Sequence, residues 1–237
     1  MSLSRDITRK VEDVLDQLSA WDGQGLRIFA SSSFQTQSLP LLHILASYKR
    51  PLDIVFLDTG YHFPETLSFR DQVAKDFGLR VINARSGVPK SQQRAADGRL
   101  LFAADTDQCC YLNKVAPLEP FLQSHDIWIS GVRADQSVVR ANMQKTVPGP
   151  HGITRYHPML DWSAKDIHDY RKAYDLPAHP LESQGYLSVG CMPCTRSYLE
   201  TLNDSANGDA RGGRWAGQTK TECGLHTELA NQESPSS

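Results

Sequence analysis

The sequence predicts an α/β fold in which a mostly parallel, twisted sheet of the Rossmann-like type is flanked by helices. Short apolar runs alternate with helical runs along the first two-thirds of the chain, which is the pattern of βαβ units. Polar turns follow two of the expected strands, at 31–38 and 58–65, and ligands bind at such places in parallel sheets. No internal repeat is visible in the 237 residues, a length that suits one domain with an appendage.

The elements can be justified in order along the chain. The first helix is expected where apolar residues recur three and four positions apart, because this spacing gives one apolar face. Pro64 suits the first turn of another helix, which Gly78 ends, and Ser163 with Asp166 resembles an N-cap pair. The expected helices are 6–18, 39–48, 64–77 and 163–174, and the expected strands are 26–31, 53–57, 79–84, 127–132 and 153–159.

The pattern changes beyond Pro180 to short irregular pieces, and glycines crowd the stretch 203–217. We therefore predict a single domain over residues 1–200 and a flexible, mobile C-terminal segment over 201–237. The last residues, 228–237, are expected to be disordered, as chain ends often are.

The composition indicates a globular protein of the cytoplasm. Hydrophobic residues make up 40% of the chain and the net charge is 25 − 27 = −2, so no overall field points to nucleic acid. No run approaches the ~20 apolar residues of a membrane span, and the N-terminus lacks the apolar core of a signal peptide. In the cytoplasm, clustered cysteines more often bind metal or do redox chemistry than form disulfides.

One cysteine of the C-terminal segment, Cys223, is a candidate nucleophile. It stands between Lys220 and His226, and nearby positive charge lowers the pKa of a thiol and so favours the reactive thiolate. Gly224 leaves the backbone beside the sulfur uncrowded. From this stretch alone, a free cysteine on a disordered tail is an equal alternative.

The other four cysteines form two pairs, Cys109-Cys110 and Cys191-x-x-Cys194. Three interpretations compete: a structural zinc site, a redox pair beside an unrelated pair, and an iron–sulfur cluster. Adjacent cysteines suit one tetrahedral ion poorly because their side chains point apart, whereas a cubic cluster binds each thiolate at a different iron. On a helix, Lys114 would lie on the same face as Cys110, where its charge would offset that of the thiolates; a solvated surface lysine is the alternative.

Taken together and in order, these motifs resemble one family. The segments are Ser-Phe-Gln at 33–35, Leu-Asp-Thr-Gly at 57–60, Cys-Cys at 109–110 followed by Lys114, Ser-Gly-Val-Arg at 130–133, Gly-Cys-x-Pro-Cys-Thr at 190–195, Gly-Arg-Trp at 213–215 and Glu-Cys-Gly-Leu-His at 222–226. They look like the assimilatory adenylyl-sulfate (APS) reductases, the iron–sulfur-containing members of the PAPS/APS reductase family. The resemblance covers residues 25–226, and the ordered set is far more specific than any single motif. It implies an adenine-nucleotide α-hydrolase-like fold and a 4Fe–4S cluster.

The resemblance also implies the reaction, which is the thioredoxin-dependent reduction of adenosine 5′-phosphosulfate (APS) to sulfite and AMP in sulfate assimilation. The nucleophilic cysteine attacks the substrate sulfur, AMP leaves, and thioredoxin or a similar dithiol protein releases sulfite from the S-sulfocysteine. The serine-rich turn resembles a modified pyrophosphate loop, because hydroxyls and backbone N–H groups before a helix suit phosphate. By position, the catalytic residues are Cys223, Lys114, His226, Arg214 and Arg211; the substrate-binding residues are Ser31, Ser33, Phe34, Gln35, Leu57, Asp58, Thr59, Gly60 and Arg133; and the metal ligands are Cys109, Cys110, Cys191 and Cys194.

Two positions depart from the family pattern. Asn113 stands where members often have an arginine, which removes a second cation near the cluster. Residues 216–218 replace the aromatic residues that often follow Gly-Arg-Trp, so the packing of that segment is open. Family members often form homo-oligomers, but nothing in this sequence marks an interface.

Three rival functions remain open at this point. The same fold acts on 3′-phosphoadenosine 5′-phosphosulfate (PAPS) in relatives that typically lack the four cysteines, and an extra basic pocket would then be needed, for which Lys90, Arg94 and Arg99 are candidates. An ATP-using thiolase or amidotransferase would need a glycine-rich loop with an acid, which 31–38 lacks. A non-enzymatic metal-binding module would have no use for Cys223.

Overall fold

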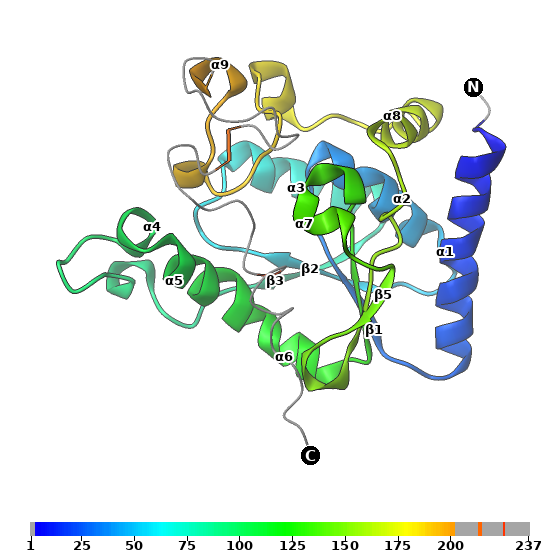
Figure 1. Cartoon of the computed structure of the whole chain (residues 1–237), viewed down its shortest axis with the longest axis horizontal. Helices are drawn as coiled ribbons and strands as arrows, with labels where there is room; N and C mark the ends of the chain where they lie inside the picture. The colour runs from blue at the N-terminus through cyan, green and yellow to red at the C-terminus, as the bar shows by residue number, and fades with distance from the viewer. Residues whose placement is uncertain (1–2, 202–212, 215–224, 226–237) are drawn as a thin grey trace.

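A computed structural model describes residues 3–201, 213–214 and 225 of the chain. Its centre is a sheet of six strands in the order β3-β2-β1-β4-β6-β5 (Figure 1). The first five strands in this order are parallel, and β5 pairs antiparallel with β6 at the edge. The strands are β1 (Ile28–Ser31), β2 (Asp53–Leu57), β3 (Arg80–Ala84), β4 (Ile127–Ser130), β5 (Thr146–Pro148) and β6 (Thr154–Tyr156).

Helices cover both faces of the sheet because its strands carry apolar residues on both sides. The larger core cluster joins one face to α1, α2, α3 and α8. The smaller cluster joins the other face, through Phe29 and Trp128, to α6. The helices are α1 (Arg5–Gly23), α2 (Leu39–Ser47), α3 (Pro64–Phe77), α4 (Leu101–Ala104), α5 (Thr106–Cys110), α6 (Ala116–Ser124), α7 (Val138–Ala141), α8 (Ala164–Ala173) and α9 (Tyr198–Thr201).

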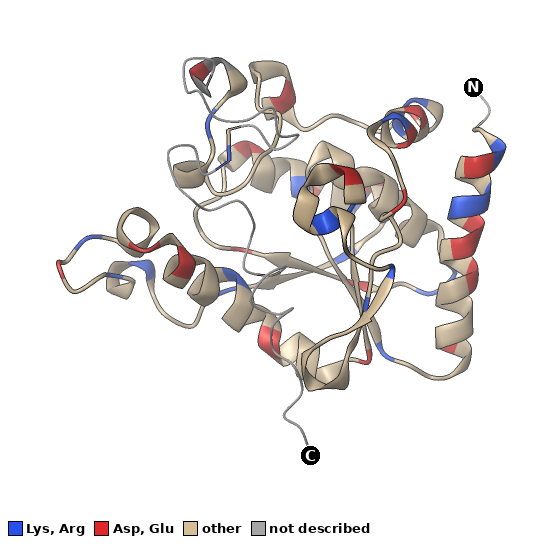
Figure 2. Ribbon diagram, in the orientation of Figure 1, with Lys and Arg blue, Asp and Glu red and all other residues tan. Residues whose placement is uncertain are grey.

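The α1 helix shows why an amphipathic sequence becomes an outer helix. The Ser4 side chain accepts a hydrogen bond from the Ile7 N–H and so caps the first turn. The apolar side of the helix is buried, while acidic and basic residues alternate along its outer side (Figure 2). Arg9 pairs with Asp6 at 2.8 Å and with Asp13 at 3.5 Å. These exposed pairs contribute little to stability, so burial of the apolar side is what fixes the helix.

The predicted fold class is confirmed, and each expected strand and helix is present. The last expected strand, 153–159, is shorter, since β6 ends at Tyr156. Strand β5 and the helical arm α4–α5–α6, which projects from the left of the sheet in Figure 1, were not predicted. Within the described residues, no helix combines the length and the apolar character needed to cross a bilayer.

Several predictions concern residues that lie outside the described part of the chain. These are the flexible segment over 201–237, with the exception of residues 201, 213, 214 and 225, and the disordered end at 228–237. Cys223, Lys220, His226 and Arg211 belong to this group.

Candidate active site

A serine-rich turn, residues 31–38, lies at the carboxyl end of β1 and leads into α2. Phe34 occupies the left-handed region with φ 53° and is fully buried, where it packs edge-on against Phe56. Its backbone N–H donates to the Ser32 hydroxyl at 3.1 Å. An anchored aromatic side chain thus forces a sharp bend, and the bend turns the neighbouring hydroxyls away from the core.

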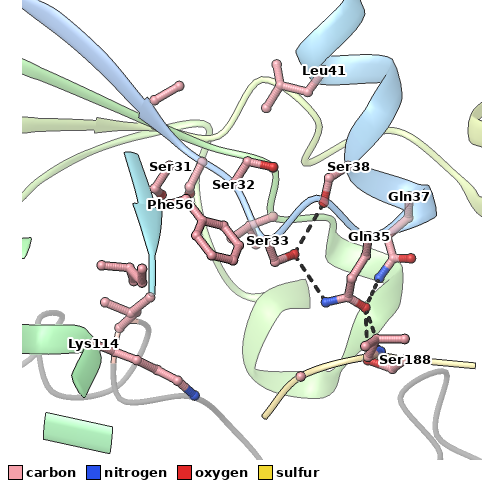
Figure 3. A pocket seen from close by; sticks show the side chains of 18 of the residues that line it. Ser31, Ser32, Ser33, Gln35, Gln37, Ser38, Leu41, Phe56, Lys114 and Ser188 are labelled. Carbon is pink, nitrogen blue, oxygen red and sulfur yellow. Dashed lines mark hydrogen bonds between the residues drawn. The ribbon is translucent and has the colours of Figure 1, made fainter. Parts of the chain in front are cut away.

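The turn borders a cavity of about 210 Å³ at the carboxyl edge of the sheet (Figure 3). Its described lining combines hydroxyl and amide groups with apolar residues of α2 and cationic side chains. This combination suits a nucleotide, since the apolar part can hold a base and the polar part a phosphate. The predicted site residues that line it are Ser31, Ser33, Gln35, Leu57, Thr59, Lys114, Cys191 and Arg214.

The residues of the Leu-Asp-Thr-Gly segment, which begins at the last residue of β2, have different roles. Leu57 and Thr59 line the cavity, whereas Asp58 and Gly60 do not appear in its lining. Burial alone would raise the pKa of the Asp58 carboxyl, but a hydrogen bond from Arg85 at 2.8 Å and one from the Gly60 N–H at 3.0 Å lower it below its ordinary value. Asp58 therefore holds the turn in shape as a carboxylate. The Phe34 side chain is likewise buried in the core, so it supports the serine-rich turn and does not line the described cavity.

The Ser-Gly-Val-Arg segment at the end of β4 lines the cavity with Ser130, Gly131 and Val132. Arg133 is buried, donates to both carboxylate oxygens of Asp135 at 2.9 and 3.2 Å, and is absent from the described lining of the cavity. Arg140, which belongs to α7, lines it together with Gln136, which accepts a hydrogen bond from Arg140. Sequence reasoning missed both residues. The sequence offered one signal for Arg140, namely that it is a second arginine shortly after Arg133.

The four paired cysteines lie together in a second, smaller cavity, although 80 residues separate the two pairs. All four are free thiols. Burial raises the pKa of Cys109 to about 11, and the neighbouring thiolates of Cys110 and Cys191 add to the effect. Among the described residues, no group of His, Cys, Asp or Glu side chains is arranged to hold a single metal ion.

A π-helical turn over Tyr111–Val115 follows the vicinal pair and presents two polar side chains to the cysteines. Asn113 donates to the Cys109 carbonyl at 2.9 Å and lies 3.6 Å from its sulfur. Lys114 Nζ lies 3.7 Å from Cys110 Sγ. The predicted proximity of Lys114 to the cysteines is confirmed, and Asn113 provides a further polar contact to the pair.

The two cavities share a wall. Thr59, Lys114 and Cys191 line both of them, and the Thr59 hydroxyl lies 3.2 Å from Cys191 Sγ. Because Cys191 itself lines the larger cavity, a ligand there lies directly beside one of the four cysteines.

The β4 and β6 strand ends add a second set of buried polar groups. Ser130, which lines the larger cavity, is hydrogen-bonded to His157 Nδ1 at 2.8 Å. Burial lowers the pKa of His157 to about 4, helped by the nearby arginines Arg155 and Arg140, so this imidazole is neutral at pH 7. A neutral ring can hold the Ser130 hydroxyl in a fixed orientation without adding charge to the cavity.

Two residues of the C-terminal segment reach this region. Leu225 lines the larger cavity, and its carbonyl accepts a hydrogen bond at 3.3 Å from Arg155, whose guanidinium stacks over Trp128. Arg214 Nη1 donates to the Val189 carbonyl at 3.4 Å. Gly190 permits this approach, since a Cβ there would lie 2.3 Å from the guanidinium carbon.

Three basic residues considered for an additional phosphate are absent from the described lining of the cavity. Lys90 lies over the Tyr61 ring at 4.5 Å. Arg94 donates to two carbonyls of its own loop, and Arg99 pairs with Asp97 at 2.7 Å.

The sheet order and a cavity at its carboxyl edge define an α/β fold of the adenine-nucleotide α-hydrolase-like class. Two solved structures share it at low sequence identity. The PAPS reductase of Candida auris, in a phosphate complex, has a TM-score of 0.61 at 22% identity, with 81% of this chain and 97% of that chain covered. An FMN adenylyltransferase of Candida glabrata, with FAD and inorganic pyrophosphate, has a TM-score of 0.61 at 14% identity, with 98% and 86% covered.

Sequence comparison is more specific. Residues 27–197 match the model of the phosphoadenosine phosphosulfate reductase domain. An adenosine 5′-phosphosulfate reductase of Rhodococcus opacus is 37% identical over 224 residues, covering 94% of this chain and 88% of the relative. One of Chelativorans is 40% identical over 198 residues, covering 82% and 77%. The chain therefore belongs to the phosphoadenosine phosphosulfate reductase family, and the predicted family of enzymes is confirmed.

Proposed function

We propose that the chain reduces APS to sulfite and AMP in sulfate assimilation, with thioredoxin or a similar dithiol protein as the electron donor in the cytoplasm. The observation that carries this proposal is the wall shared by the nucleotide-sized cavity and the four-cysteine cavity. The named bacterial relatives support the choice of APS.

The adenylate part of the substrate would occupy the larger cavity. The apolar side chains of α2 can contact the base, and the hydroxyls of the serine-rich turn can donate to phosphate oxygens. Lys114, Arg140 and Arg214 would then face the phosphosulfate from different segments of the chain. Fixed cations stabilise the negative charge that develops on AMP as it leaves.

The residues present fit an iron–sulfur cluster. Four free thiols line one cavity, and burial, together with repulsion from the neighbouring thiolates, raises the pKa of Cys109 to about 11. A positively charged group is therefore needed to hold all four as thiolates. Cys109, Cys110, Cys191 and Cys194 would be the ligands of a 4Fe–4S cluster. Such a cluster would supply structural support and a local electrostatic field beside Lys114.

The covalent step falls to Cys223. Its thiolate forms a bond to the sulfonyl sulfur, the S–O bond to AMP breaks, and AMP leaves with the electron pair. A thiolate of the dithiol protein then attacks the Cys223 sulfur, and sulfite leaves with the electron pair of the S–S bond. The second thiol releases Cys223 and forms a disulfide in the donor, which accounts for the two electrons in sulfite. His226 and Arg211 are proposed to assist in the same segment.

Mass spectrometry of the intermediate tests the proposal. Protein mixed with APS in the absence of dithiol should gain one SO3 group on Cys223, and dithiol protein should remove it as sulfite. Cys223→Ser should bind AMP normally but neither gain the group nor form sulfite. Normal sulfite production by this variant would refute the mechanism.

PAPS is the alternative substrate, because the family model and the Candida auris structure carry that name. A 3′-phosphate needs additional cations, and Lys90, Arg94 and Arg99 are engaged away from the described cavity. We therefore expect kcat/KM for APS to exceed that for PAPS. Equal values would indicate dual specificity.

A further inference from the structure

One side chain, Gln35, joins the serine-rich turn to the segment that precedes the second cysteine pair (Figure 3). Its Nε2 donates to the Ser33 hydroxyl at 3.1 Å. Its Oε1 accepts from the Val189 N–H at 2.9 Å and from the Ser188 hydroxyl at 3.4 Å. The same oxygen also accepts from Gln37 Nε2 at 2.9 Å. Both ends of one planar carboxamide are therefore engaged, one with the turn and the other with a segment more than 150 residues away.

The segment that Gln35 holds leads directly to a cysteine. Ser188 and Val189 are buried, at 3% and 5% exposure, and Cys191 follows two residues after Val189. The Gly190 N–H donates to the Thr195 hydroxyl at 3.1 Å, and this hydroxyl donates to the Cys191 carbonyl at 2.9 Å. Hydrogen bonds on either side of the Val189–Gly190 peptide link thus connect the serine-rich turn to the backbone of Cys191.

A second contact joins the serine-rich turn to an earlier part of the same stretch of chain. The His179 N–H donates to the Thr36 hydroxyl at 2.9 Å, and His179 Nε2 is hydrogen-bonded to the Thr66 hydroxyl at 3.0 Å. This contact fixes the start of the stretch 179–190, while Gln35 fixes its end. Cys191 itself is also held by backbone pairing with His62 and by the Met192 N–H, which donates to the Tyr61 carbonyl at 2.7 Å. Loss of Gln35 would therefore loosen Ser188 and Val189, just before Cys191, and leave these other contacts in place.

We propose that Gln35 is a positioning residue that couples occupation of the serine-rich turn to the placement of Cys191. The proposal rests on the proposed function in one respect, namely that an adenylate phosphate engages the turn. A ligand that fixes the Ser33 hydroxyl also fixes the Gln35 carboxamide, and through it the Val189 peptide. Since coupling between two sites is reciprocal, the placement of Cys191 also affects the affinity of the turn for the ligand.

Alkylation of the second cysteine pair by iodoacetamide measures this coupling without catalysis. The as-purified protein is treated anaerobically with iodoacetamide and an iron chelator, with and without AMP, so that each cysteine reacts once it is free of metal. Modification of Cys191 and Cys194 is followed by peptide mass spectrometry. Gln35→Met keeps the length of the side chain and removes its hydrogen bonds. Without AMP, we expect alkylation of Cys191 to be about tenfold faster in this variant, the factor that follows from losing a net hydrogen bond of about 1.4 kcal/mol.

The effect of AMP is the readout that a merely structural role would not change. AMP should slow alkylation of Cys191 at least threefold in the wild type and leave the rate in Gln35→Met unchanged. Gln35→Glu retains the acceptor for Val189 and should show an alkylation rate close to that of the wild type in the absence of AMP. Gln37→Met is the matched control, because Gln37 contacts Gln35 but has no described hydrogen bond to 188–190.

The outcomes separate the two proposals. Equal alkylation rates of wild type and Gln35→Met without AMP would overturn the role of Gln35, whatever the enzyme does. If AMP still slows the alkylation of Cys191 in Gln35→Met, the coupling does not pass through Gln35 and this part of the proposal is overturned. Faster alkylation in Gln35→Met, combined with no binding of AMP to the wild type by calorimetry, would refute both the nucleotide site of the proposed function and the coupling. It would retain Gln35 as the support of Cys191.

Discussion

Replacement of Lys114 by alanine tests the shared wall most directly. The ammonium group lies 3.7 Å from Cys110 Sγ and also lines the larger cavity. A unit charge about 4 Å from an anionic group contributes about 4 kcal/mol at an effective dielectric constant of about 20. Because the cavity is open to water on one side, we take about half of this value as the lower limit.

A loss of about 2–4 kcal/mol corresponds to a decrease of roughly 30- to 1000-fold in kcat/KM. The assay is the initial rate of sulfite formation from APS with thioredoxin, together with iron quantitation on the same samples. Iron content should stay within about 20% of the wild-type value, because Lys114 is not a thiolate. Lys90→Ala is the matched control, since Lys90 lies over Tyr61 and does not line the described cavity, and its rate should stay within about threefold of the wild-type rate.

Two results would refute the reasoning about Lys114. If Lys114→Ala turns over at the wild-type rate, the ammonium does not act on the substrate. If iron and activity fall in proportion, Lys114 supports the metal centre alone.

Two further variants test the buried polar groups at the sheet edge. The pKa of His157 is lowered in the folded state to about 4 from the ordinary 6.5, so the unfolded chain binds the proton first and stability is lost as pH falls from about 6.5 through 4. Between pH 7.5 and 5 this amounts to about 2 kcal/mol. The free energy of unfolding, measured in urea, should therefore fall by about 2 kcal/mol less for His157→Gln than for the wild type over this pH range. The exposed control His168→Gln should show the same fall as the wild type. An equal fall in all three proteins would contradict the assignment. Arg155→Lys keeps a positive charge but shortens the donor to the Leu225 carbonyl, and we expect a roughly tenfold lower kcat with an unchanged dissociation constant for AMP by calorimetry; an unchanged kcat would mean that this contact does not position the C-terminal segment.

Periodicity was sufficient to predict the central elements of the fold. Helix α1 is specified by apolar residues that recur three and four positions apart over its whole length. Helix α3 is specified by its first residue, Pro64, and by Gly78, which ends it. The strands of the parallel sheet are short apolar runs, and they were placed to within a few residues. Strand β5 has only three residues and ends in Pro148, so it has no pattern of its own and exists because β6 lies beside it.

The helical arm was missed for a different reason. Pro120 lies inside α6 and breaks the expected sequence pattern of a helix. Burial of Leu118 and Leu122 against the sheet compensates for the missing backbone donor.

The candidate site was predictable where a motif places residues close together in the chain. The serine-rich turn, the cysteine pairs and Lys114 belong to this group. That Arg140 and not Arg133 lines the described cavity was not predictable, since it depends on how the chain folds after β4, where Arg133 pairs with Asp135. The contact between Arg155 and Leu225 spans 70 residues, and no local pattern encodes it.

Strand β5 runs antiparallel to its neighbour β6, and this affects the rim of the cavity, which is the carboxyl edge of the parallel strands. A parallel connection would need a crossover of a dozen or more residues, whereas the hairpin of β5 and β6 returns the chain to the same rim after a short turn at 149–153. The backbone visits the rim twice within this hairpin, and the His157 N–H donates to the Lys145 carbonyl at 2.7 Å where the two visits meet. Because side chains alternate along a strand, inserting a single residue into β6 would turn Arg155 to the opposite face of the sheet. The length of this small hairpin therefore decides on which face of the sheet the Arg155 side chain lies.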